Sequence, residues 1–184
     1  MLKSNRLLDI AGNQFGYFTT AQAVAAGIND ANVRQMAARG ALKKVFRGVY
    51  RIDDFPHSEH DQYMEACLWA NGKGFIIDKS ALVLWNLCDV NPRKIYLGIP
   101  RNHRITKNVP HLFEVKKVAH GFNEIDEVKG IPVLAPYLTI KRCINNNMRS
   151  DLLTQAINNA YKFDYLDKKQ EARLIVQLDE RDRP

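Results

Sequence analysis

The sequence lacks the long hydrophobic run that a membrane-spanning helix requires. Its longest uninterrupted apolar stretches have the length of a β-strand, whereas a helix that crosses a bilayer needs about 20 apolar residues. The N-terminal residues 1–12 contain neither the uninterrupted hydrophobic region nor the small-residue cleavage site of a secretory signal. These absences predict a cytoplasmic protein that has no membrane partner.

The sequence also lacks the spacings that mark common metal, redox and catalytic sites. Its three cysteines, Cys67, Cys88 and Cys143, are scattered, and their odd number and wide spacing predict free thiols rather than a disulfide framework. No H-E-x-x-H, no C-x-x-C, no phosphate-binding G-x-x-x-x-G-K-[ST] and no G-x-S-x-G frame occurs. We therefore expect no catalytic residues, no metal, no cofactor and no enzymatic activity.

Positive charge is in excess, and it is concentrated in one short segment. Hydrophobic residues make up 46% and charged residues 26% of the chain, which is ordinary globular composition, and the formal net charge is +7. Five basic residues and no acidic residue lie between Arg39 and Arg51. Such a cluster favours a polyanionic partner, because basic side chains attract phosphates. This segment therefore predicts binding to nucleic acid.

The residues before and within this basic segment have the pattern of a winged helix-turn-helix. A first helix is expected over residues 4–12, a second from Thr19-Thr20 to Gly27, and a third from Asn29 or Asp30 to Arg39. Only Ile28 and Asn29 separate the second and third helices, which forces a sharp helix-turn-helix. Residues 41–52 then predict a β-hairpin that turns at Gly48.

The third helix predicts a surface for reading DNA bases. Val33, Met36 and Ala37 recur at helical spacing and are expected to face inward, which leaves polar side chains outside. Asn and Gln can bond adenine edges, and Arg can bond guanine. The predicted base-reading residues are Asn29, Asn32, Arg34 and Gln35, with Arg39 on the same outward face. The predicted phosphate-contacting residues are Thr20, Gln22, Lys43, Lys44, Arg47 and Arg51. A purely structural module with a solvated basic face is the alternative.

A break at residues 53–56 predicts a domain boundary, with a winged helix-turn-helix domain over 1–55 and an α+β domain over 56–184.

Pro132 suggests that the strand containing it is an edge strand. Ser58 and Asp61 resemble a capping box that opens a helix reaching about Asn71. The other elements expected are strands over 75–77, 94–99, 112–118 and 131–134, and helices over 79–87, 136–144, 151–161 and 167–180.

Three weaker patterns in the second region leave other functions open. Glu114-Val115-Lys116 on a predicted strand resembles part of a metal-dependent nuclease site, although the tripeptide is common and alternating charges on an exposed strand explain it well. His57 and His60, beside Glu59 and Asp61, could ligate a metal or cap a helix. Residues 100–104 form a basic loop that suits nucleic acid or an acidic partner. A winged helix that has lost DNA binding, and serves as a protein-interaction module, is a further alternative.

In addition, the order of motifs resembles the AbiEi-like antitoxins of type IV toxin–antitoxin systems, which act in abortive infection. The likeness spans about residues 14–146. It is carried by Phe18-Thr19-Thr20-Ala21-Gln22-Ala23 with Gly27-Ile28; Arg39-Gly40-Ala41-Leu42 with Phe46-Arg47-Gly48-Val49-Tyr50-Arg51; Ser80-Ala81-Leu82 with Leu84-Trp85-Asn86-Leu87; and Gly130-Ile131-Pro132-Val133 with Pro136 and Thr139-Ile140.

This resemblance implies a transcriptional regulator whose N-terminal winged helix represses its own operon by binding double-stranded operator DNA. It also implies a C-terminal domain that counteracts a nucleotidyltransferase-like toxin without requiring a stable complex with it. The operator sequence, the identity of the toxin and the oligomeric state do not follow from the sequence.

Overall fold

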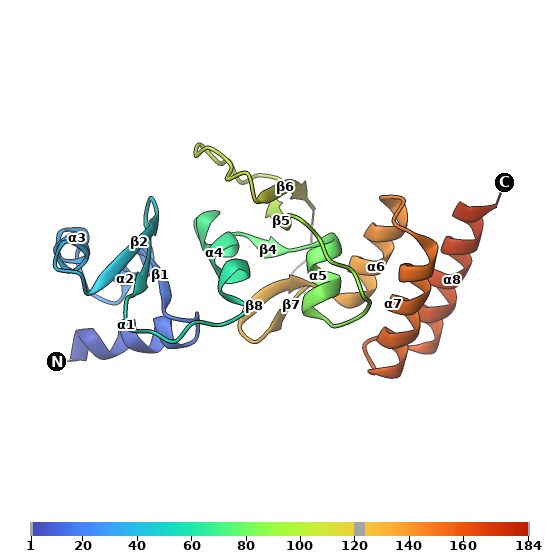
Figure 1. Ribbon diagram of the computed structural model, residues 1–184, viewed down its shortest axis with the longest axis horizontal. Helices are drawn as coiled ribbons and strands as arrows, with labels where there is room; N and C mark the ends of the chain where they lie inside the picture. Colours follow the sequence, from blue (N-terminus) through green and yellow to red (C-terminus); the bar gives the residue numbers. More distant parts are fainter. Residues whose placement is uncertain (1, 120–123, 184) are drawn as a thin grey trace. The chain divides into compact units, whose positions relative to one another are not determined.

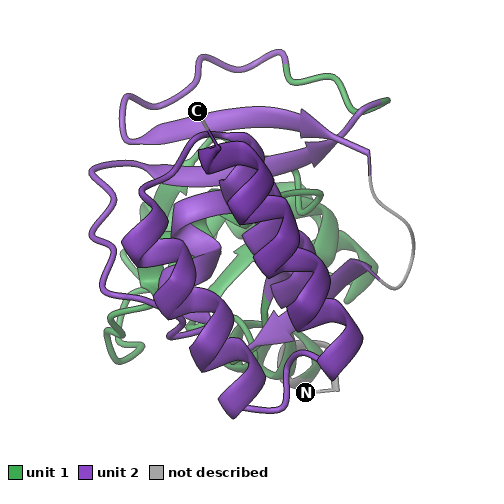
Figure 2. Ribbon diagram, turned by 90° about the vertical axis from the view of Figure 1, so that its right-hand side faces the viewer, with its two compact units in different colours: residues 1–74, 102–105, 129–131 green, residues 75–101, 106–128, 132–184 purple. Residues whose placement is uncertain are grey.

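The computed structural model describes residues 2–119 and 124–183, with side chains described from Arg6 onward. The chain forms two compact units, which Figure 2 distinguishes by colour. The first unit comprises residues 1–74, 102–105 and 129–131, and the second comprises residues 75–101, 106–128 and 132–184. Each unit is described separately below.

The first unit begins with the predicted winged helix-turn-helix and continues through one further helix (Figure 1). Its elements are α1 (Leu2–Gly12), β1 (Tyr17–Thr19), α2 (Thr20–Ala25), α3 (Asp30–Ala38), β2 (Leu42–Phe46), β3 (Val49–Ile52) and α4 (Asp61–Trp69).

Local sequence signals account for the short α2 and α3. Thr19 caps α2, because its hydroxyl accepts a hydrogen bond from the Gln22 backbone N–H at 3.1 Å while the Gln22 side chain accepts from the Thr19 N–H at 2.8 Å. Gly27, with a φ of +88°, takes the left-handed conformation that ends α2. Asn29 caps α3 by accepting from the Asn32 N–H at 2.8 Å. The residues that begin and end α2 and α3 therefore determine where the turn between these two helices lies.

A three-stranded antiparallel sheet completes the winged module, with the strand order β1-β3-β2. The short β1 is absent from the sequence prediction, and its presence makes β3 the central strand, with Tyr17 opposite Arg51 and Phe18 opposite Tyr50. The helices and the sheet share one core, which consists of Leu7, Ala11, Phe18, Ala23, Ala26, Val33, Leu42 and Tyr50. Burial of these apolar side chains is the main stabilising term of the unit.

The second unit combines a mixed sheet with four helices. Its elements are β4 (Phe75–Ile76), α5 (Asp78–Leu84), β5 (Ile95–Pro100), β6 (Phe113–Val118), β7 (Ile125–Val128), β8 (Ile131–Leu134), α6 (Pro136–Asn145), α7 (Ser150–Lys162) and α8 (Lys168–Asp182). Only the first residue of β8, Ile131, counts with the first unit.

The five strands lie in the order β6-β5-β4-β8-β7. β4 is antiparallel to β5 and parallel to β8, and β5 is parallel to β6. The prediction that Pro132 marks an edge strand is wrong, because β8 lies between β4 and β7. A proline can occupy an inner strand this short because the pairing with β4 is made through Val133, opposite Ile76.

The closing helices α7 and α8 pack against each other and lie side by side in Figures 1 and 2. Each buries one apolar stripe, formed by Leu153, Ala156, Ile157 and Ala160 on α7 and by Leu174 and Leu178 on α8. The α+β class with an N-terminal winged helix-turn-helix, a mixed α/β region and closing helices is confirmed. None of the helices in the described ranges combines the length and apolar character of a membrane span.

The cysteines are free thiols, as the sequence predicts. Cys67 and Cys143 are buried, and burial raises the pKa of both thiols well above the ordinary value. Cys88 is half-buried, and burial raises its pKa to about 11. Thiols with such pKa values are largely protonated at neutral pH and are therefore poor nucleophiles.

Candidate nucleic-acid interface

Helix α3 turns one apolar face into the core and leaves a polar face exposed. Val33 is fully buried, and Met36 and Ala37 pack against the same core. Asn32 and Gln35 are exposed on the opposite side of the helix. Their amide groups can each donate and accept hydrogen bonds, which is the requirement for bidentate contact with a base edge.

Arg34, on the exposed face of α3, is held only by a weak contact with a residue of the same helix. Its guanidinium lies 2.9 Å from the Asp30 carboxylate, and the two side chains are 66% and 50% exposed. An exposed ion pair between residues four apart on a helix contributes about 0.3–0.5 kcal/mol. A DNA base or phosphate can therefore replace Asp30 as the partner of Arg34 at small cost.

Two of the residues predicted to contact DNA use their side chains in helix-capping hydrogen bonds. The Asn29 side chain accepts the Asn32 N–H, as described above. The Gln22 side chain accepts from Thr19 through its oxygen and donates from Nε2 to Gln14 Oε1 at 3.0 Å. Both amides hold α2 and α3 in place, so their assigned role is structural.

The hairpin supplies the basic part of the interface. Lys43, Lys44 and Arg47 are all exposed, and β2 is an edge strand with a bulge between Lys44 and Phe46. Gly48 makes the tight turn with a φ of +77°. Thr20 is half-buried beside this turn, where its backbone N–H donates to the Gly48 carbonyl at 2.9 Å. The start of α2 thus fixes the tip of the wing.

The predicted phosphate contact by Arg51 is wrong. Arg51 is only 3% exposed and donates to the carbonyls of Phe55 at 2.7 Å and Pro56 at 2.9 Å. Its guanidinium also lies 3.6 Å from the Asp61 carboxylate and above the Tyr17 ring. The physical reason is that the turn at residues 55–56 and α4 cover the face of β3 that bears Arg51, and that β1 places Tyr17 opposite it.

Arg51 and Tyr17 attach α4 to the winged module. Besides the Arg51–Asp61 contact, the Tyr17 hydroxyl donates to Glu65 Oε1 at 2.7 Å. Burial and the neighbouring carboxylate raise the pKa of Tyr17 above its ordinary value, so the hydroxyl keeps its proton. These contacts explain why the first compact unit runs to Gly74 rather than ending near residue 55.

The histidines considered as metal ligands have other partners. His57 Nδ1 lies 2.9 Å from Asp61, and His60 Nε2 lies 2.9 Å from the Lys129 ammonium, which can donate to it. The helix begins at Asp61, after His60, rather than directly after Ser58. No group of three or more potential ligands occurs among the described residues. The geometry around His57 and His60 is that of a helix start.

Glu114 and Lys116, which resemble part of a nuclease site, belong to separate ion pairs. Glu114 pairs with Lys94 at 3.2 Å on the exposed edge strand β6, whereas Lys116 pairs with Asp78 at 3.0 Å. Both arrangements neutralise a carboxylate that a metal would need. Asp78 also pairs with Arg142, 2.8 Å away, and the sequence gives no sign of this pair because 64 residues separate the two in the chain.

The motifs that carry the family resemblance in the second unit meet in its core. The Ser80 hydroxyl accepts from the Tyr96 N–H at 2.9 Å, which joins α5 to β5. The Trp85 indole N–H and the Thr139 hydroxyl both donate to the Leu134 carbonyl, at 3.0 and 2.8 Å. These motif residues therefore hold α5, α6 and β8 together, and their role is structural.

Comparison with known proteins gives a family for the N-terminal segment and a fold for the whole chain. Residues 5–52 match the sequence model of a family described as "Transcriptional regulator, AbiEi antitoxin". The predicted resemblance is thereby confirmed over the helix-turn-helix and the wing. No curated protein matches the chain.

Among solved structures, the chain is similar to the crystal structure of the RV2827C protein from Mycobacterium tuberculosis. The TM-score is 0.57 at 14% sequence identity, and the similarity covers 99% of this chain and 78% of that chain. At such low identity the likeness shows a shared fold and nothing about activity. It extends beyond the family match, however, because it includes both compact units.

Proposed function

We propose that this chain, whose N-terminal segment matches the AbiEi antitoxin regulators, is a DNA-binding transcriptional regulator that reads its operator with α3. One observation carries the proposal. The exposed face of α3 presents Asn32, Arg34 and Gln35 while Val33 on the opposite face is fully buried. A helix held by its apolar face, with amide and guanidinium groups outside, suits insertion into the major groove.

The proposed contacts divide into base-reading and phosphate-binding groups. Asn32, Arg34 and Gln35 read base edges, and Arg39 at the end of α3 contacts the DNA beside them. Lys43, Lys44 and Arg47 on the wing, together with Thr20, contact phosphates. Asn29, Gln22 and Arg51 are omitted because their side chains are used within the fold.

The experiment is a fluorescence anisotropy titration of the full chain with labelled DNA from upstream of its own reading frame. A shuffled duplex of equal length serves as the nonspecific competitor. Replacement of both Arg34 and Gln35 by alanine should cost about 1–3 kcal/mol for each lost bidentate contact and abolish the preference for the upstream sequence. Binding of the shuffled duplex should change little.

The wing is tested by its salt dependence. The double change Lys43→Ala and Lys44→Ala should weaken binding to both duplexes and reduce the slope of log K against log salt by about 0.9 for each lost phosphate contact. Lys168→Ala with Lys169→Ala is the matched control, because it removes the same charge from exposed positions on α8. Equal weakening in the control, or a wild-type chain that does not distinguish the duplexes, would refute the proposal.

The antitoxin function is the finer part of the proposal. It is supported by the description of the family that matches residues 5–52. We infer that the chain represses its own operon and counteracts a nucleotidyltransferase-like toxin encoded beside it. Co-expression of the neighbouring reading frame with and without this chain tests the inference. Growth inhibition that this chain relieves is the expected result, and growth that is unaffected by the neighbour alone would contradict it.

A further inference from the structure

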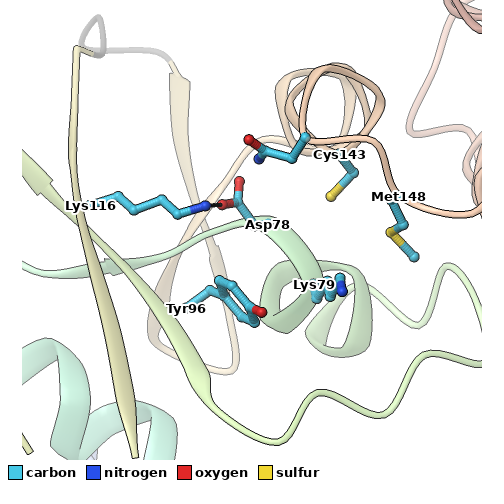
Figure 3. Close-up of a pocket in the computed structure, with 7 residues that line it drawn as sticks. Asp78, Lys79, Tyr96, Lys116, Cys143 and Met148 are labelled. Atoms are coloured by element: carbon cyan, nitrogen blue, oxygen red, sulfur yellow. Dashed lines mark hydrogen bonds and ion pairs between the residues drawn. The ribbon is translucent and has the colours of Figure 1, made fainter. Parts of the chain in front are cut away.

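The second unit contains a small cavity that the proposed DNA contacts do not use. It has a volume of about 130 Å³ (Figure 3). It lies where α5, β5, β6 and the end of α6 meet. Its lining residues are Asp78, Lys79, Tyr96, Lys116, Cys143, Asn146 and Met148.

A buried carboxylate organises the polar side of this cavity. The Asp78 side chain is 3% exposed, and its oxygens accept from Arg142 Nε at 2.8 Å and Lys116 Nζ at 3.0 Å. In Figure 3 the Lys116 ammonium lies beside the Asp78 carboxylate, and a dashed line marks their contact. A carboxylate this deeply buried stays ionised only when cationic or hydrogen-bonding groups contact it. Asp78 therefore holds two cationic groups at fixed positions, one from β6 and one from α6.

The cations at this site outnumber the carboxylate. Lys79 lines the cavity together with Lys116, and it has no carboxylate partner among the described residues. With Asp78, Lys79, Lys116 and Arg142 ionised, the cluster carries a net charge of +2. Lys116 lines the cavity and its side chain remains 36% exposed, so its remaining N–H groups can reach a ligand. Arg142 does not line the cavity and contributes its charge through the contact with Asp78.

The backbone at the same point adopts an uncommon conformation. Asp78 has a φ of +51°, in the left-handed region that non-glycine residues seldom occupy. Backbone strain of this kind concentrates at ligand-binding sites, where the surrounding structure enforces it.

We propose that this cavity binds the phosphate group of a phosphate monoester. Such a group carries about −1.5 to −2 charges at neutral pH and offers three acceptor oxygens, which matches the net charge of +2 and the donors present. A metal cation would be repelled by the same charge. Tyr96, Cys143 and Met148 form a less polar wall against which the first carbons of the ester can lie.

The size of the cavity limits what enters it. Its volume of about 130 Å³ is below the roughly 300–1,000 Å³ of pockets that enclose drug-sized ligands. The phosphate end of the ligand is therefore enclosed, and the remainder extends outside. The phosphate can come from a nucleotide or from a non-nucleotide ester, and the two sources require separate arms of one experiment.

Isothermal titration calorimetry of the full chain in phosphate-free, low-salt buffer tests the site. The probes are adenosine 5′-monophosphate and glycerol 3-phosphate, with adenosine and glycerol as unphosphorylated controls. Binding of both esters supports a site that recognises the phosphate alone. Binding of only one ester supports the site and identifies its source. Absence of heat with both esters, or equal binding of the unphosphorylated controls, overturns the proposal.

Lys79 gives the sharpest variant, because it lines the cavity without pairing with Asp78. Lys79→Gln should weaken ester binding about tenfold, since a hydrogen bond to a charged group is lost, while Lys79→Arg should retain it. Lys141→Gln, on an exposed position of α6, is the matched control. Melting curves by circular dichroism confirm that each variant is folded. An equal loss in Lys141→Gln and Lys79→Gln would refute the site, and that result leaves DNA binding by the first unit untouched.

Discussion

Arg47 and Arg51 lie four residues apart on one hairpin, but their surroundings give them different tasks. Arg47 is exposed at the turn, whereas Arg51 is enclosed by the Phe55 and Pro56 carbonyls, Asp61 and the Tyr17 ring. A buried guanidinium with these partners stabilises the fold, and an exposed one can reach a phosphate. Burial thus separates structural from functional arginines within one basic segment.

Replacement of Arg51 by alanine should destabilise the first unit. The change leaves the Phe55 and Pro56 carbonyls without their donor and removes the cation beside the Asp61 carboxylate. Breaking a buried ion pair costs about 3–5 kcal/mol. Since Asp61 is partly accessible, we expect the lower end of this range, measured as the free energy of unfolding in urea. Arg47→Ala, the matched control, should change stability by less than about 0.5 kcal/mol while weakening DNA binding. Equal stability of the two variants would contradict this division.

The position of Arg51 could not be inferred from the sequence because one strand was missing from the prediction. Residues 41–52 alone describe a two-stranded hairpin in which Arg51 faces solvent. The strand β1 has only three residues, Tyr17–Thr19, too few to show alternation, and it pairs with β3 across about 30 intervening residues. A contact of that range has no local signal.

At the scale of the element, the helix termini were the most predictable part of the fold. Thr19, Asn29 and Asp167 each accept a backbone N–H of the following turn, as their side chains predict. Pro136 likewise opens α6 at its first turn. Caps depend on residues within one turn of each other, so the sequence shows them directly.

The cap of α3 gives a prediction with a built-in control. Asn29→Ala removes the side chain that accepts the Asn32 N–H and should reduce stability by about 1 kcal/mol. Asn32→Ala leaves that bond intact, since Asn32 contributes its backbone, and should leave stability unchanged while reducing sequence preference on DNA. Urea unfolding and anisotropy on both variants distinguish these roles. A larger stability loss in Asn32→Ala than in Asn29→Ala would reverse the assignment.

Strands were less predictable than helices, for identifiable reasons. β7 (Ile125–Val128) carries Asp126 and Glu127 on an outer strand and shows no alternation, so nothing marks it as a strand. Pro132 suggested an edge because proline lacks the N–H of a ladder bond. The order of strands in a sheet depends on pairing between distant segments, and composition does not encode it.

At the scale of the whole molecule, the first unit uses α4 as part of the winged-helix module. Tyr17 bonds to Glu65, and Arg51 contacts Asp61. The sequence placed a boundary at residues 53–56 because Asp53, Asp54 and Pro56 interrupt the regular pattern. They do form a turn, but the chain after the turn packs back onto the same unit.

A fragment comparison tests this larger unit. The fragment 1–74 retains α4, whereas the fragment 1–55 loses its contacts with Tyr17 and Arg51. Two lost buried polar contacts cost at least about 2 kcal/mol, so the shorter fragment should melt roughly 10 °C lower, as followed by circular dichroism. Identical melting temperatures would show that α4 adds nothing to the winged helix.

The candidate interface was more predictable than the cavity. Asn32, Arg34, Gln35 and the exposed wing lysines lie within a continuous stretch whose periodicity separates inside from outside. The cavity cluster joins Asp78, Lys116 and Arg142 from three distant elements. Each of these residues, taken alone in the sequence, resembles an ordinary surface charge.

The division of the chain between its units has a consequence for protein synthesis. The first unit includes residues 102–105 and 129–131, which leave the ribosome long after the wing. At about 5–20 residues per second, roughly 80 residues of further translation separate Ile52 from Ile131, or about 4–16 s. The helices that would meet DNA are thus made first. The Lys129 contact with His60, 2.9 Å between the two nitrogens, can form only near the end of that delay.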